Sequence, residues 1–239
     1  MATTIKISDT LAWILAFTVQ RPNTGVANIA NEPGLTAANK IMQSIASPPF
    51  RWSWNRVENT SITTVIGTND YVVALANWGW LEKATCTDPV TGDIKEIEVS
   101  QVLAKDSTQN RPQKIAPILD DNAGNITFRM FPAPDQAYPI VLTYQKAAVQ
   151  ATTLGSTTWA PIPDRYAFLY EQGMLALIQG MYSTQLYMAN IEIFWRQLVG
   201  AAEGMTETEK AIFLEDQLRI IRTGQNSGLS VTQGKQVRL

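Results

Sequence analysis

The spacing of apolar residues changes character twice along the chain. Both ends carry apolar residues at helical spacing, whereas the segment from Phe50 to about Ala148 alternates apolar and polar residues. A period of 3.6 places side chains on one face of a helix, and a period of two places them on one face of a strand. The sequence therefore predicts an α+β chain, in which a bundle formed by N- and C-terminal helices carries an inserted antiparallel β-sheet or sandwich domain.

The N-terminal part, residues 1–49, predicts two helices of the helical domain, over residues 10–20 and 35–46. The second helix is expected to end at Ser47, because Pro48 and Pro49 cannot continue it.

Residues 50–150 predict the β domain. Turn residues at 67–70 separate two runs rich in β-branched and aromatic side chains, and 88–93 predicts a second hairpin. Alternation over 126–130 and again over 140–145 gives each strand one apolar face. We expect an antiparallel sheet or small sandwich with one solvated side.

Residues 151–224 predict the C-terminal helices of the helical domain. One helix begins at Pro163 and Asp164, and another carries an apolar stripe from Tyr187 to Leu198. A third begins at Thr206, which forms a capping box with Glu209, and ends at Gly224 as its C-terminal cap. The remaining residues, 225–239, predict an extended polar tail.

The helix over 164–182 is apolar on nearly every face. Phe168, Leu175 and Tyr182 repeat every seven residues beside the main stripe. A further line of small residues allows close backbone approach and predicts a subunit interface: Gly173, Ala176 and Gly180. The alternative is that a bundle within one chain buries this helix.

Composition excludes several classes of protein. The chain has 239 residues with 19 basic and 21 acidic side chains, so its net charge of -2 offers no excess for gripping a nucleic-acid backbone. It has no histidine, which excludes Ser-His-Asp and Cys-His sites and HExxH metal sites. Its single cysteine, Cys86, is expected to be a small buried filler in a strand. No apolar run approaches the roughly 20 residues that span a bilayer.

Acidic pairs are the remaining candidates for chemistry. Asp120 and Asp121 are adjacent, as are Glu215 and Asp216, so the members of a pair do not face each other across a substrate. The stretch 120–125 resembles a calcium loop only vaguely, because Phe131 stands where glutamate is required. We expect solvated carboxylates and a turn between strands, with no catalytic, cofactor-binding or metal residues.

Several signatures occur in an order that resembles the head-to-tail adaptor, or tail tubular protein A, of tailed bacteriophages. They are Pro48-Pro49-Phe50-Arg51-Trp52, Gly67-Thr68-Asn69-Asp70-Tyr71, Phe128-Arg129-Met130-Phe131-Pro132-Ala133-Pro134, Tyr138 to Tyr144, and Pro161-Ile162-Pro163-Asp164. The resemblance implies a non-enzymatic structural subunit in a dodecameric ring at the head-tail junction of the virion, assembled in the host cytoplasm. It further implies docking beneath the portal protein and above a downstream tail or nozzle protein, with DNA passing through the lumen without specific binding.

The C-terminal tail has an unusual charge. From Leu218 onward the chain contains basic residues and no acidic side chain: Arg219, Arg222, Lys235 and Arg238. This asymmetry favours an acidic docking surface. In the resembled family the C-terminal segment reaches the portal, which implies a portal docking role for Val237, Arg238 and Leu239.

A rival reading is a tail-associated module that recognises carbohydrate or the host. Four tryptophans would stack on sugars: Trp52, Trp54, Trp78 and Trp80. Such a module would expose at least two of them. A third reading, an enzyme that relies on a lone carboxylate or lysine, has no supporting motif.

Overall fold

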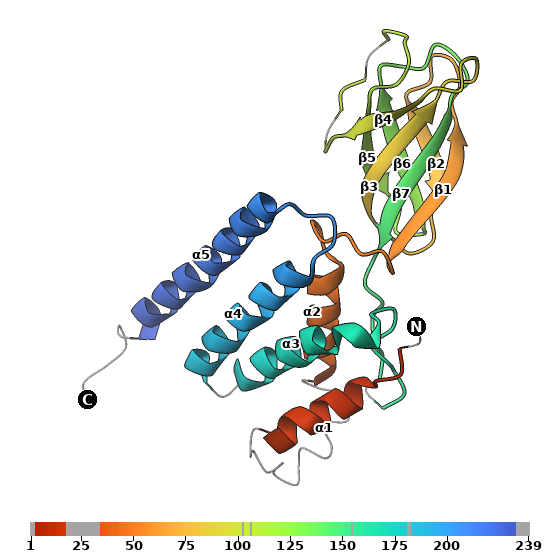
Figure 1. Ribbon diagram of the computed structural model, residues 1–239. Helices are drawn as coiled ribbons and strands as arrows, with labels where there is room; N and C mark the ends of the chain where they lie inside the picture. The colour runs from red at the N-terminus through yellow and green to blue at the C-terminus, as the bar shows by residue number, and fades with distance from the viewer. Residues whose placement is uncertain are drawn as a thin grey trace. The chain divides into compact units, whose positions relative to one another are not determined.

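A computed structural model describes residues 3–17, 34–101, 103–105, 107–153, 155–180 and 183–232 (Figure 1). The chain divides into two compact units. One contains Met1–Ile45 and Val149–Leu239, and the other contains Ala46–Ala148. The protein is therefore a mixed α and β chain whose β unit is inserted between two helical segments.

The β unit is a curled sheet of seven strands with the order β1-β7-β3-β4-β5-β6-β2. The strands are β1 (Arg56–Thr63), β2 (Asp70–Ala74), β3 (Trp78–Thr87), β4 (Ile94–Val99), β5 (Lys114–Asp120), β6 (Asn125–Phe131) and β7 (Pro139–Lys146). All neighbours pair antiparallel except β4 and β5, which are parallel. The sheet is thus mixed and not purely antiparallel as expected. The connection over residues 100–113 is long enough to return the chain to the side of Glu98, where Lys114 begins β5, so that β5 can run parallel to β4.

Alternation along the strands builds the core of this unit. Ile126, Phe128 and Met130 of β6 are buried, and the residues between them are half-buried. Cys86 lies in the same core, as the sequence predicted. The curl of the sheet lets inward-facing side chains from every strand meet in one cluster.

One expectation for strand pairing in the β unit is wrong. The turn between β1 and β2 lies at residues 65–68, where the Thr68 N–H donates to the Val65 carbonyl (3.0 Å), but these two strands do not pair: β1 pairs with β7 and β2 with β6. In contrast, the turn over 88–93 joins the paired strands β3 and β4, as predicted. Local turn chemistry permits a hairpin, but the pairing depends on which strands share the core.

The predicted solvated side is also absent along part of β7, where Thr143 and Gln145 are buried. This strand is a central one, because it pairs with β1 along one edge and with β3 along the other. The Gln145 amide is satisfied internally, because its Nε2 donates to Glu82 (2.8 Å) and its Oε1 accepts from the Trp52 backbone N–H (3.3 Å).

The helical unit has five helices among the described residues. They are α1 (Ile7–Phe17), α2 (Gly34–Ala46), α3 (Ala167–Gly180), α4 (Thr184–Ala201) and α5 (Glu207–Thr232), and a short 3-10 turn, η2 (Asp164–Tyr166), precedes α3. The larger helix contacts are pairwise, between α1 and α3, α3 and α4, and α4 and α5. These pairwise contacts do not amount to the predicted single bundle of helices from both ends of the chain.

Most helix starts agree with the sequence, but one end does not. The Thr206 backbone N–H donates to Glu209 Oε2 (2.7 Å) and the Glu209 N–H donates to Thr206 Oγ1 (3.2 Å), which confirms the capping box. However, α5 continues past Gly224 to Thr232, so residues 225–232 are helical and not an extended tail. An interior glycine costs a helix only about 1 kcal/mol, which an established helix tolerates.

Parts of three predicted elements lie outside the described residues. They are residues 18–20 of the first predicted helix, 181–182 of the predicted helix over 164–182, and 233–239 of the predicted tail. The last group includes the whole predicted portal docking set: Val237, Arg238 and Leu239.

Candidate functional site

The small residues of α3 pack against helices of the same chain. A Cβ atom on Gly173 would lie 2.5 Å from Ile41 Cδ1 of α2 and 3.1 Å from Phe194 Cδ2 of α4. A Cβ atom on Gly180 would lie 2.8 Å from Tyr187 Cδ2 of α4, and Ala176 is fully buried.

Within one chain, the predicted interface residues Gly173, Ala176 and Gly180 thus have neighbours of their own. Their small size allows α2 and α4 to approach α3 closely. Leu175 is likewise buried within the chain, but Phe168 at the start of α3 stays 42% exposed. Tyr182 lies outside the described residues.

Large apolar side chains remain exposed on the outer helices. Leu186 (48%) and Ile193 (43%) are seven residues apart on α4 and therefore share a face. On α5, Ile212 (58%) and Ile220 (61%) also point to solvent. Scattered exposed leucines are common in proteins, but repeated exposure along two contacting helices is typical of an interaction surface.

Helix α5 has both covered and exposed apolar residues. Against α4, the Phe213 ring meets the Trp195 ring at a centroid distance of 5.9 Å, and Leu218 is nearly buried. Ile212 and Ile220 are exposed, and Ile220 lies two turns beyond Phe213 on the same face. Helix α5 thus has apolar side chains that α4 leaves uncovered and that are available for binding.

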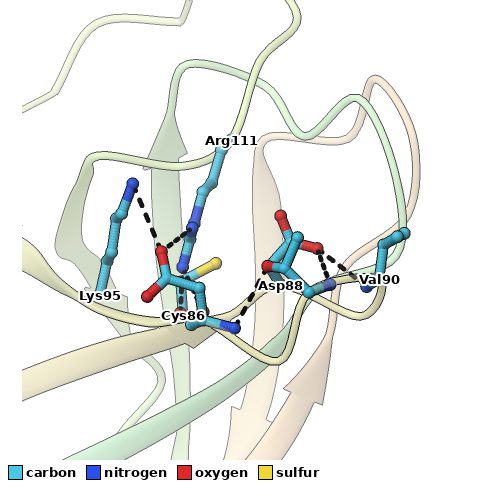
Figure 2. A network of polar contacts seen from close by, with 7 residues as sticks. Cys86, Asp88, Val90, Lys95 and Arg111 are labelled. Atoms are coloured by element: carbon cyan, nitrogen blue, oxygen red, sulfur yellow. Dashed lines mark hydrogen bonds and ion pairs between the residues drawn. The ribbon is translucent and has the colours of Figure 1, made fainter.

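In the β unit, a polar network joins the loop before β5 to the β3–β4 hairpin (Figure 2). Arg111 Nη2 donates to the backbone carbonyls of Cys86 (2.6 Å) and Asp93 (2.8 Å). The Asp93 carboxylate also forms ion pairs with Arg111 and Lys95, each at 3.5 Å. The Arg111 guanidinium thus connects its own loop to β3 and to the turn between β3 and β4.

The electrostatics of this network indicate a structural role. Burial raises the pKa of the Cys86 thiol, so the protonated and unreactive form dominates near neutral pH. The backbone N–H groups of Val90 (2.8 Å) and Thr91 (3.1 Å) donate to Asp88 and hold the pKa of its carboxyl below the usual value. Because the Asp88 carboxylate already accepts these hydrogen bonds within the turn, it has a structural role there.

The two acidic pairs lie in a turn and on a helix surface. Asp121 accepts from the Ala123 (2.7 Å) and Asn125 (3.0 Å) backbone N–H groups, which confirms a turn between β5 and β6. Asp216 pairs with Arg219 on the exposed side of α5 at 3.0 Å. Within the part of the chain that the structure describes, no three Asp, Glu or Cys side chains are grouped so that they could hold a metal ion.

The four tryptophans of the rival carbohydrate reading are not exposed. Trp52 is fully buried and stacks on Trp54, with ring centroids 5.6 Å apart. Trp78 meets the Phe128 ring edge-on at 5.4 Å. Trp54, Trp78 and Trp80 are each partly buried, so these four tryptophans do not present a pair of exposed rings for a sugar to stack on.

Two residues that the sequence analysis missed organise the β unit. Arg111 stands in a loop, and nothing in its local sequence indicates a structural role. Gly79 lies between two tryptophans inside β3, and an isolated strand glycine is a known sign of a bulge or close backbone approach. The sequence therefore contained a signal for Gly79 but none for Arg111.

Comparison with known proteins identifies no relative: no protein-family model matches the chain, and no curated protein matches it. None of the helices that the structure describes is long and apolar enough to cross a membrane.

Proposed function

We propose that this chain is a structural subunit that works by self-assembly, as the head-to-tail adaptor of a tailed bacteriophage. It forms a ring under the portal protein, joins capsid to tail and surrounds the channel through which DNA passes. The observation that carries this proposal is the row of exposed apolar side chains on α4 and α5. The choice of a phage adaptor over another self-assembling protein rests on the order of sequence signatures that resembles that family.

The proposed subunit interface is the outer surface of α4 and α5, defined by Leu186, Ile193, Ile212 and Ile220. Neighbouring copies would bury these side chains, and each large aliphatic side chain contributes about 1.5–3 kcal/mol when fully buried. In this proposal the helices from both ends of the chain act together as a bundle that presents one rigid outer face.

The proposed partners follow from the same arrangement. The portal docks the C-terminal end, where Val237, Arg238 and Leu239 follow the basic residues of α5, and a downstream tail or nozzle protein lies on the other side of the ring. DNA slides through without specific binding, which agrees with a net charge of -2.

Substitutions on α5 test the interface. Ile212→Glu and Ile220→Glu each place a charge on the outer surface, and we expect both to reduce ring formation at least tenfold, since a buried unpaired charge is costly. Thr208→Glu, which adds the same charge at another exposed position of α5, is the matched control and should assemble normally. Negative-stain imaging and sedimentation of the protein mixed with the portal protein from the same genome measure assembly.

Circular dichroism first has to show that each variant is folded. Rings that form undiminished with both glutamate variants would refute the α4–α5 interface. If the unaltered protein forms no ring with the portal at any concentration tested, the adaptor function itself is refuted.

A further inference from the structure

The N-terminal segment before α1 is bound to one short stretch of the chain. The Thr3 hydroxyl donates to the Ile162 carbonyl (2.9 Å), and the Trp159 N–H donates to the Ile5 carbonyl (3.2 Å). Lys6 forms an antiparallel bridge with Thr158. The Lys6 carbonyl accepts from the Asp9 (3.2 Å) and Thr10 (3.3 Å) backbone N–H groups, so Lys6 belongs to the start of α1. We call residues 3–5 the strap.

A single carboxylate receives most of the strap's donors. Asp164 accepts from the Thr4 backbone N–H (3.0 and 3.1 Å to its two oxygens), from the Thr4 hydroxyl (2.7 Å) and from the Ile5 N–H (3.4 Å). The sequence analysis assigned Asp164 to the start of a helix, and the structure shows that it also holds the strap. Hydrogen bonds to an ionised carboxylate are roughly twice as strong as neutral ones.

Apolar contacts anchor the chain only after the strap. Ile7 and Ile14 of α1 are fully buried, and Trp159 Nε1 donates to the Thr10 hydroxyl of α1 (2.9 Å) while its ring stacks on Tyr170 at 4.4 Å. Within the strap, Ile5 is the one apolar side chain, and it is only partly buried. The strap therefore depends on polar bonds, whereas α1 depends on packing.

From this contrast we infer that the strap is a detachable element: residues 3–5 leave and rejoin the helical unit as one piece, with Asp164 as the group that holds them, while Lys6 and α1 stay in place. Such local opening needs far less free energy than unfolding the unit. Release exposes an extended segment whose backbone N–H and C=O groups are then open to a partner chain. This inference does not depend on the proposed adaptor function.

Hydrogen exchange of backbone amides tests it on the full-length protein. In Asp164→Ala we expect the Thr4, Ile5 and Trp159 amides to exchange about tenfold faster or more, because all three bonds belong to the strap. The Ile7 amide, which donates to the Thr157 carbonyl (3.1 Å), should keep its protection, as should α1 and α3. Asp164→Asn retains one acceptor oxygen and should give a smaller increase.

Asp216→Ala, which removes an exposed carboxylate from α5, is the control and should leave all these amides unchanged. Thr4→Val removes only the hydroxyl donor and provides a milder variant if Asp164→Ala disturbs α3. Unchanged exchange at Thr4 and Ile5 in both variants would overturn the inference. So would a parallel loss of protection at Ile7 and along α1, since the strap would then not be a separate element.

Discussion

Gly79 shows how much one residue contributes to the β unit. It lies in β3 where the pairing with β7 shifts register between Trp78 and Trp80. A Cβ atom at this position would lie 2.7 Å from the Ala147 backbone nitrogen and 2.7 Å from the Gln145 carbonyl oxygen. Backbone atoms of a central strand cannot move aside as the end of a side chain can, so only glycine fits there.

We therefore expect Gly79→Ala to lower the free energy of unfolding of the β unit by about 1–3 kcal/mol, the usual cost of overpacking. Urea denaturation followed by tryptophan fluorescence measures the change. Gly200→Ala on α4 is the matched control, because a Cβ atom there would meet nothing within 4 Å, and it should be neutral or slightly stabilising. Equal stability of Gly79→Ala and the unaltered protein would show that β3 can shift to accept a side chain.

At the scale of elements, α5 differs most from its prediction. It extends to Thr232, eight residues beyond the expected cap at Gly224. At about 3.6 residues per turn, those eight residues add about two turns to the helix. Residues 225–232 therefore continue α5 where the sequence predicted a tail.

Two truncations separate the helix from the residues that follow it. Ending the chain after Thr232 should leave the helical content unchanged but abolish portal binding, because it removes Val237, Arg238 and Leu239. Ending it after Gly224 should also lower the helical content, as measured by far-ultraviolet circular dichroism. A full-length variant with Val237, Arg238 and Leu239 replaced by alanine is the control for length, and it too should fail to bind. Normal binding by the first truncation would refute the portal docking role.

At the scale of the whole molecule, the β unit has the properties of an independent module. Its core draws on its own strands, and its first and last segments are held together: Asn55 Nδ2 donates to the Lys146 carbonyl (2.8 Å), and the Lys146 N–H donates to the Asn55 carbonyl (3.2 Å). Chain ends that lie side by side are typical of an inserted domain.

A fragment of residues 46–148 should therefore fold alone and unfold cooperatively, and it should not bind the portal or form rings, because α4 and α5 are missing. Thermal unfolding followed by near-ultraviolet circular dichroism tests the first point, and negative-stain imaging tests the second. The same fragment carrying Gly79→Ala should be less stable, which connects the two predictions about this unit. A fragment without a cooperative transition would show that the strands need the helical unit to fold.

The sequence by itself determined the features that depend on neighbouring residues. Alternation located β6, the Thr206–Glu209 pair located the start of α5, and Pro48 and Pro49 marked the end of α2. Periodicity, capping and proline effects act over a few residues, so one sequence is enough to recognise them.

Only the tertiary structure decided which strands pair, which face of α3 is covered and what Asp164 holds. The predicted turn at 67–70 gave no sign that β1 and β2 belong to opposite ends of the sheet. The line of small residues on α3 was compatible with a neighbour from any chain, and the structure supplied Ile41, Phe194 and Tyr187 of the same chain. These contacts join residues distant in sequence, and their energies depend on shape and burial in three dimensions, which no local pattern encodes.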